Sequence, residues 1–123
     1  MTTTNTRRGE LELTTAQLAA HPDDARYAWL ITEDRISDGD AKDVMGPSTA
    51  HPDLVEAVQR PGEHRIRFRM YDDDGGYYYG GYLTYDPNDD SDEPPYGPLR
   101  DFGLPDAGAV RITYPDRPDL DCA

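Results

Sequence analysis

Two groups of acidic residues carry the side chains that could do chemistry in this chain of 123 residues. Three consecutive aspartates begin at position 72, and a second group occupies the segment 86–93. Neighbouring carboxylates can bind a cation, and their charges can also imitate the phosphates of a nucleic acid. We expect these groups to form one acidic binding surface, made of Asp72, Asp73, Asp74, Asp86, Asp89, Asp90, Asp92 and Glu93.

The second group has a spacing that resembles the start of an EF-hand calcium loop, with oxygen-bearing side chains at positions 86, 88, 90 and 92. However, Ser91 stands where that loop needs glycine, and Gly97 stands where it needs glutamate. We therefore expect no dedicated metal site and no cofactor, and at most weak binding of divalent cations by this loop.

Catalytic patterns are absent from the sequence. It contains no G-x-S-x-G, P-loop, H-E-x-x-H or paired C-x-x-C motif. The histidines at 21, 51 and 64 lie in three separate segments, and the single cysteine, Cys122, lies close to the C-terminus without the enclosed pocket that a nucleophile needs. The sequence therefore predicts a protein that is not an enzyme.

The charge balance is strongly acidic, with 25 acidic residues, 12 basic residues and a net charge of −13. One explanation is solubility or adaptation to high salt. The other is that the acidic surface is itself the binding site, for a positively charged protein that otherwise binds DNA or RNA. Both explanations remain open at this stage.

A stretch of alternating residues could form a basic and aromatic surface, because Arg65, Arg67 and Arg69 would share a strand face next to Tyr78 and Tyr82. Such sheet faces bind single-stranded nucleic acid in other proteins. The same arginines could instead neutralise nearby acidic groups. Because the net charge repels phosphate, direct nucleic-acid binding is not expected.

These side chains would be positioned by a β-hairpin over residues 64–85. Apolar residues at 66, 68 and 70 alternate with arginines, which is the period of a half-buried strand. A turn-forming Asp and Gly cluster follows, and then a tyrosine-rich strand at 77–85. The two acidic groups would lie at opposite ends of that second strand, roughly 30 Å apart at ~3.3 Å per residue.

Two registers of this hairpin keep the apolar side chains on one face. With Asp74 and Gly75 as the turn residues, Ile66 faces Leu83; with the turn moved to 75–76, Ile66 faces Tyr85. A three-residue loop would break this arrangement, since a one-residue slip moves every side chain to the other face.

The remaining elements complete a small α+β domain. We predict helices at 14–20 and 48–60, and further strands at 27–32 and 109–114. The predicted architecture is a three- to four-stranded, mainly antiparallel sheet with one or two helices on one face, built on the central β-hairpin.

The domain is expected to span 11–114, between a disordered N-terminus at 1–10 and a C-terminal tail at 115–123. A long, acidic, proline-rich loop is predicted at 86–108, with Tyr96 and Phe102 as possible anchors for a partner. A lone cysteine and the lack of a long apolar run indicate a cytoplasmic protein that does not enter a membrane.

Three parts of the chain carry a resemblance to other proteins: YAWLITED (27–34) with VMGP (44–47), RMYDDDGGYYYGG (69–81) and GPLRDFGLPDAGAVRITY (97–114). They resemble uncharacterised small acidic proteins of actinobacteria, their phages and plasmids. The resemblance implies no activity for individual residues. It implies a context of mobile-element genes, in which small acidic inhibitors of host defence are common.

The sequence therefore favours a non-enzymatic acidic interaction protein, which would imitate a nucleic acid and inhibit a DNA- or RNA-binding or defence protein of the host. The alternative is an accessory domain that is acidic for solubility or salt tolerance, with weak metal binding in the loop 86–93.

Overall fold

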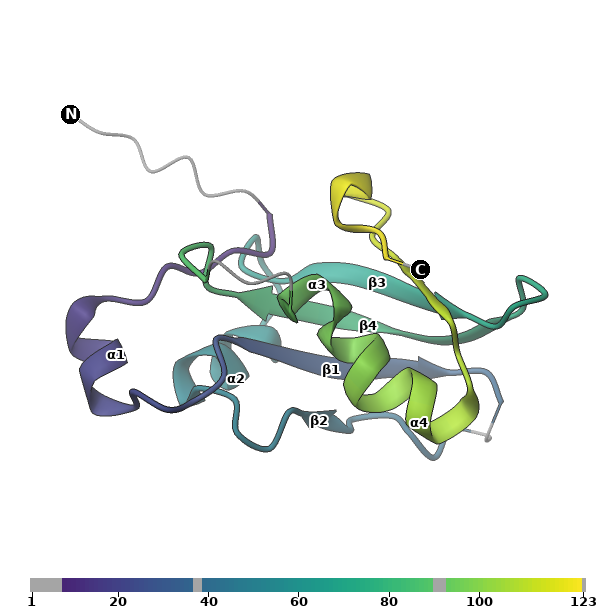
Figure 1. Cartoon of the computed structure of the whole chain (residues 1–123), viewed down its shortest axis with the longest axis horizontal. Helices are drawn as coiled ribbons and strands as arrows, with labels where there is room; N and C mark the ends of the chain where they lie inside the picture. Colours follow the sequence, from purple (N-terminus) through teal and green to yellow (C-terminus); the bar gives the residue numbers. More distant parts are fainter. Residues whose placement is uncertain (1–7, 37–38, 90–92, 123) are drawn as a thin grey trace.

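The computed structural model describes residues 8–36, 39–89 and 93–122. Its centre is a five-stranded sheet with the order β2-β1-β4-β3-β5, in which every neighbouring pair is antiparallel (Figure 1). The predicted α+β class, with an antiparallel sheet built on the central hairpin, is confirmed. The strands are β1 (Tyr27–Asp34), β2 (Met45–Gly46), β3 (Ile66–Tyr71), β4 (Tyr77–Tyr85) and β5 (Arg111–Thr113).

The hairpin of β3 and β4 follows the first of the two predicted registers, since Ile66 pairs with Leu83. Its loop nevertheless has three residues, because the N–H of Asp72 donates to the carbonyl of Gly76. The pairing shifts by one residue beside Tyr78, which forms a β-bulge. The extra residue in the strand offsets the extra residue in the loop, so the apolar face is kept.

The segment expected to be an irregular loop is helical over 93–107, which corrects that part of the prediction. It consists of α3 (Glu93–Pro98), the π-helix η1 (Leu99–Gly103) and α4 (Leu104–Ala107). Prolines hide this helix in the sequence, but those at 94 and 95 stand in its first turn, where backbone N–H groups need no helical acceptor. The N–H of Leu104 donates to the carbonyl of Leu99, five residues earlier, as in a π turn.

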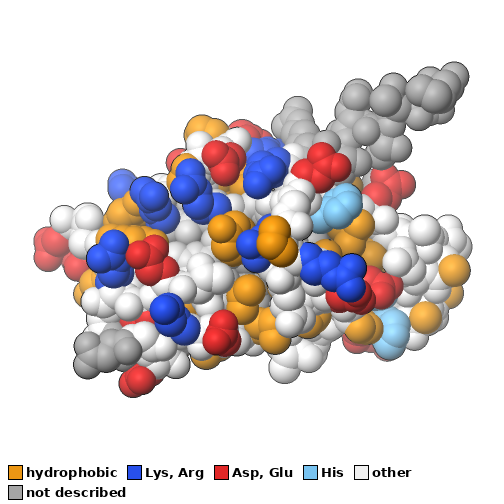
Figure 2. Space-filling view, turned by 180° about the vertical axis from the view of Figure 1, so that it is seen from behind, with side chains coloured by type: hydrophobic (Ala, Val, Ile, Leu, Met, Phe, Trp, Pro, Cys, Tyr) orange, Lys and Arg blue, Asp and Glu red, His pale blue; other side chains and the backbone are white. Residues whose placement is uncertain are grey.

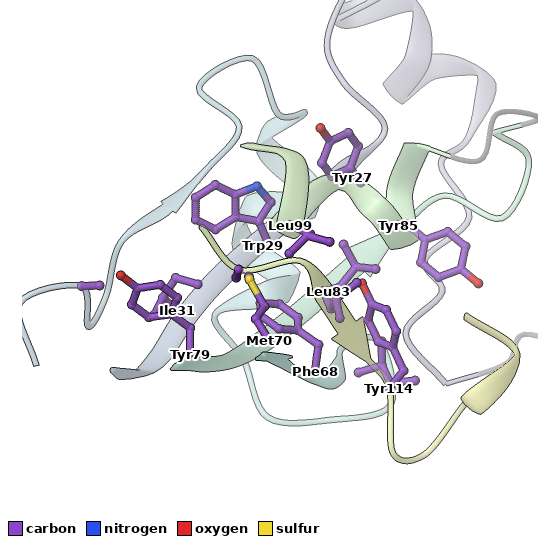
Figure 3. Packing of buried hydrophobic residues seen from close by; sticks show 14 residues of the cluster. Tyr27, Trp29, Ile31, Phe68, Met70, Tyr79, Leu83, Tyr85, Leu99 and Tyr114 are labelled. Carbon is purple, nitrogen blue, oxygen red and sulfur yellow. The ribbon is translucent and has the colours of Figure 1, made fainter. Parts of the chain in front are cut away.

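Helical segments cover both faces of the sheet, where the sequence predicted one face. Leu54 and Val58 of α2 (Pro52–Val58) pack with Ala28 and Leu30 of β1. On the opposite face, Leu99 joins a larger cluster of buried side chains from the sheet (Figure 3). That cluster includes Tyr27, Trp29, Ile31, Phe68, Met70, Tyr79, Leu83 and Tyr114.

The helix α2 begins later than predicted, at Pro52. The N–H of Ala25 donates to the carbonyl of Thr49, and this bridge keeps the chain extended just before the helix. Buried His51 is the N-cap, where its Nδ1 accepts from the N–H of Asp53. A shorter helix, α1 (Thr15–Ala20), lies beside it and is joined to it by the hydrogen bond between His51 Nε2 and the carbonyl of Gln17.

Both ends of the described chain are packed against the sheet. Glu10 is buried and forms a parallel bridge with Tyr85, although the sequence placed it in a disordered terminus; residues 1–7 lie outside the described part. The expected C-terminal tail contains a short 3-10 helix, η2 (Pro118–Leu120), and Cys122 pairs with Ile112. Within the described residues, no helix is both long and apolar enough to cross a membrane.

Candidate functional site

The acidic residues predicted from the sequence do not come together in one cluster. Asp72, Asp73 and Asp74 form the β3–β4 turn, whereas Asp86 and Asp89 follow β4 at the other end of the sheet (Figure 1). The predicted surface therefore consists of two separate groups in the structure. The predicted residues Asp90 and Asp92 lie outside the described part of the chain.

Asp72 is part of the turn itself. Its Oδ1 accepts hydrogen bonds from the N–H groups of Asp74 at 3.0 Å and Gly76 at 2.6 Å. Carboxylate oxygens of Asp72, Asp73 and Asp74 lie within 4.8 Å of one another. Asp73 and Asp74 are exposed, but Asp72 is half-buried and holds the backbone of the hairpin loop.

Asp86 is fully buried, so its carboxylate does not belong to an exposed surface. Its Oδ1 accepts from the N–H of Asn88 at 2.9 Å, and Oδ2 has no hydrogen-bond partner among the described residues. A carboxylate in this position closes a turn, and it does not present the first ligand of an EF-hand-like loop to solvent. Glu93 is exposed and forms an ion pair with Arg100 at 3.0 Å.

A site that sequence reasoning missed lies between the helical segment and the β1–β2 connection. Two hollows of about 230 Å³ and 330 Å³ share the side chains of Phe102 and Asp106. We call them together the Phe102 groove. Its lining is made of Asp40, Ala41, Val44, Asp101, Phe102, Pro105 and Asp106.

The floor of the Phe102 groove is anchored in the core. The Phe102 ring packs on Tyr79, with ring centroids 4.9 Å apart, and on Trp29 at 5.5 Å. The π turn of η1 places Asp101 over β1, where its Oδ2 accepts from the Tyr27 hydroxyl at 2.6 Å and from Trp29 Nε1 at 3.2 Å. These contacts hold the ring and the carboxylate in one position.

Asp106 is positioned in the same way, because its Oδ2 accepts a hydrogen bond from the Tyr79 hydroxyl at 2.6 Å. Burial, together with Asp101, raises the pKa of Tyr27 well above its usual range. The Tyr27 hydroxyl therefore stays protonated and remains a donor to Asp101. Arg100 adds an ion pair to Asp101 at 3.2 Å and donates to the Tyr27 hydroxyl at 2.6 Å.

The composition of the lining suits binding better than catalysis. Among the described residues that line the Phe102 groove there is no histidine, cysteine, serine or lysine. Carboxylates around an aromatic ring can hold a guanidinium or ammonium group, by charge and by contact with the ring face. Of the two predicted anchors, Phe102 lines this groove, and Tyr96 packs against the core cluster from α3.

Another hollow, of about 320 Å³, lies between α1 and α2. Its carboxylates already have partners in the chain: Asp53 accepts from Gln17 at 2.9 Å, and Glu56 forms an ion pair with Arg60. Arg60 and His64 also line this hollow, whereas no arginine, lysine or histidine is among the described residues that line the Phe102 groove. This hollow therefore offers less net negative charge for a ligand than the Phe102 groove does.

Comparisons with known proteins add no identity to these observations. No protein-family model, curated protein or solved structure matches the chain. The resemblance to small acidic proteins of actinobacteria stays a prediction.

Proposed function

We propose that this chain is a non-enzymatic interaction protein that binds a positively charged protein through its acidic surface, with its carboxylates in the place of nucleic-acid phosphates. The observation that supports this most is the Phe102 groove, in which Asp40, Asp101 and Asp106 line two hollows that share the Phe102 side chain. The partner's chemistry is that of a DNA- or RNA-binding protein, because such proteins present exposed arginines and lysines.

An arginine of the partner fits this groove in a defined way. Its aliphatic stem lies along Phe102 and Pro105, and its guanidinium reaches the carboxylates of Asp40 and Asp106. A cation over an aromatic ring contributes ~0.5–2 kcal/mol, depending on how far water is excluded. Three exposed apolar side chains near the same elements offer contact area for the partner's surface: Val44, Met45 and Leu104.

The net charge supports the same function by a different route. A surface that carries −13 overall attracts cationic partners over a distance and so raises the rate of encounter. Because this attraction is screened within about 10 Å at 0.1 M salt, the binding should weaken as salt is added.

The test is affinity capture from a nuclease-treated actinobacterial lysate at low salt, with bound proteins identified by mass spectrometry. We expect the wild-type chain to retain nucleic-acid-binding proteins, and we expect added oligonucleotide to displace them. Asp106→Asn should lose most of this capture, because it removes the charge but can still accept from the Tyr79 hydroxyl.

The matched control is Glu12→Gln, which removes one charge at an exposed position outside the groove. The control should capture the same proteins as the wild type. Equal losses in both variants would show that the Phe102 groove is not the binding site. If the captured proteins include no nucleic-acid-binding protein, the proposed function is wrong.

A further inference from the structure

The sheet face on the α2 side carries a group of arginine and tyrosine side chains beyond the helix. Lysine and arginine side chains gather over one half of this side in Figure 2. We call the group the arginine face. It is made of Arg35, Arg67, Arg69, Arg111, Tyr71 and Tyr77.

Tyr77 reaches this face because of the β-bulge. In a regular strand, Tyr77 would point to the same side as Tyr79, two residues on, and so into the core. The bulge pairs Tyr77 with Tyr71 instead, and the two rings lie 5.7 Å apart. Two aromatic rings therefore stand next to each other on an otherwise polar sheet face.

The ring of Tyr77 extends along its own strand, over Gly80. A Cβ on Gly80 would collide with the Tyr77 hydroxyl, so the hydroxyl lies in the space that a side chain at position 80 would fill. The hydroxyl donates to Glu33 Oε1 at 2.6 Å, which holds the ring in this position. A small hollow of about 130 Å³ beside it is lined by Arg67, Arg69 and Gly80, among others.

Guanidinium groups surround the two rings. Arg35 and Arg69 lie 5.4 Å and 5.8 Å from the centroid of Tyr77, and Arg111 lies 5.2 Å from the centroid of Tyr71. These distances place the cations at the rings, where each guanidinium can still contact a phosphate through its remaining N–H groups.

The charges on this face are only partly paired with carboxylates of the described residues. Within the described part, no carboxylate lies within ion-pair distance of Arg69 or Arg111, and Arg67 meets Asp116 only at 3.8 Å. Arg35 is paired with Glu33 at 3.0 Å. In a chain with 25 acidic residues, exposed arginines without carboxylate partners are not explained by neutralisation of neighbouring acids.

We propose that the arginine face binds single-stranded nucleic acid, with bases stacked on Tyr77 and Tyr71 and phosphates bound by Arg67, Arg69 and Arg111. Stacking requires unpaired bases, so a single strand fits this flat face better than a duplex. The net charge alone gave the opposite expectation, but local charge decides contacts this close. The acidic turn at residues 72–74 adjoins Tyr71 and Tyr77, so the phosphates are expected on the other side of the two rings, over Arg67, Arg69 and Arg111. This inference does not depend on the Phe102 groove.

The test is fluorescence anisotropy at low salt, with a labelled single-stranded DNA and a labelled RNA of about 12 nucleotides, within the usual range of site sizes. We expect both to bind, and we expect Tyr77→Ala to weaken binding by about 10-fold or more, because one stacked base is lost. Contacts with three phosphates give a slope of about −2 when the logarithm of affinity is plotted against the logarithm of salt concentration.

Three comparisons decide the outcome. Tyr77→Phe keeps the ring and should bind nearly as well as the wild type, which tests stacking even if Tyr77→Ala is unfolded. Arg69→Gln should bind more weakly than Arg60→Gln, which removes an equal charge from an exposed arginine paired with Glu56 near α2. The inference is overturned by absent binding, by equal losses in the two arginine variants, or by a duplex that binds as tightly as the single strand.

Discussion

The hydroxyl of Tyr77 fills the space in which any side chain at position 80 would stand, so Gly80 and Tyr77 depend on each other. Here glycine is needed because a side chain of the same strand lies close to its backbone, and a positive φ plays no part. This relationship allows the ring to reach Glu33 and gives the arginine face its flat aromatic centre.

The first prediction concerns this pair. Gly80→Ala should destabilise the fold by about 1–3 kcal/mol, because the new methyl group displaces the Tyr77 hydroxyl and breaks its bond to Glu33. In a Tyr77→Phe background the hydroxyl is absent, and the same substitution should cost much less. Urea denaturation of the two single variants and the double variant measures this difference. Additive effects would show that the two residues do not interact.

The second prediction concerns Arg117, which joins both ends of the chain to the sheet. Its Nη1 lies 3.3 Å from Glu10 Oε2 and 2.9 Å from the Tyr85 hydroxyl, and its Nη2 lies 2.7 Å from Asp119. Arg117→Met should reduce the free energy of unfolding by about 3–5 kcal/mol, because the buried Glu10 loses its ion pair with Arg117 and Tyr85 loses a donor.

Urea denaturation also checks the Arg117 prediction, with Arg8→Met as its control. Arg8 is exposed and meets Asp116 only at 3.9 Å, so its loss should change stability by less than about 1 kcal/mol. Similar effects of the two substitutions would contradict a structural role for the buried group. Adding Glu10→Gln to Arg117→Met should restore part of the stability, since no buried charge then remains at position 10.

The third prediction is a loss of stability in alkali. Burial raises the pKa of Tyr114 well above its usual range, and burial is also the main cause of the raised pKa of Tyr27 and Tyr85. Tyrosines of the unfolded chain ionise near pH ~10, so the folded state holds protons that the unfolded state releases. The contribution of these tyrosines to stability should be constant below that pH and should fall above it, by ~1.4 kcal/mol per pH unit for a tyrosine such as Tyr114.

The control for the alkaline loss is Tyr114→Phe. It should be less stable at neutral pH by about 1 kcal/mol, because it loses the hydrogen bond to the carbonyl of Pro95, but its decline in alkali should be shallower. The chain has nine tyrosines and Lys42 is its one lysine, so lysine titration contributes little in this range. Denaturation curves at several pH values give both slopes, and equal slopes would contradict the assignment.

The fourth prediction separates the acidic residues of the hairpin turn by role. Asp72→Ala should destabilise the fold by about 1 kcal/mol, because two backbone N–H groups lose their acceptor, as they do when a capping side chain is removed. Asp73→Asn and Asp74→Asn, both exposed, should leave stability nearly unchanged. Thermal unfolding is a sufficient measurement, and a large loss of stability at position 73 or 74 would show that these carboxylates also hold the turn.

The hairpin shows how far local pattern can predict a structure. The alternation of Ile66, Phe68 and Met70 with arginines correctly predicts which face is buried, because a strand has a period of two. The three-residue loop and the bulge at Tyr78 could not be predicted, since the sequence permits several turns and only packing against β1 and β5 selects among them. As a result, the orientation of Tyr77 was missed.

The candidate site was harder to predict than the fold. Asp101 and Asp106 stand in a segment whose prolines suggested an irregular loop, and their helical arrangement forms only where Leu99 and Phe102 can pack on the sheet. Asp86 has the same side chain as the exposed acids, yet it is buried. Residue type alone does not reveal that difference.

The sequence by itself determined the α+β class, the antiparallel hairpin and the excess of negative charge, because composition and period-two patterning are local properties. Tertiary structure alone decided which carboxylates are buried, which line the Phe102 groove, and which arginines stand beside tyrosines. The physical reason is that burial and charge pairing depend on residues distant in the chain, such as Asp101 and Trp29, that meet only after the sheet and its helices have packed.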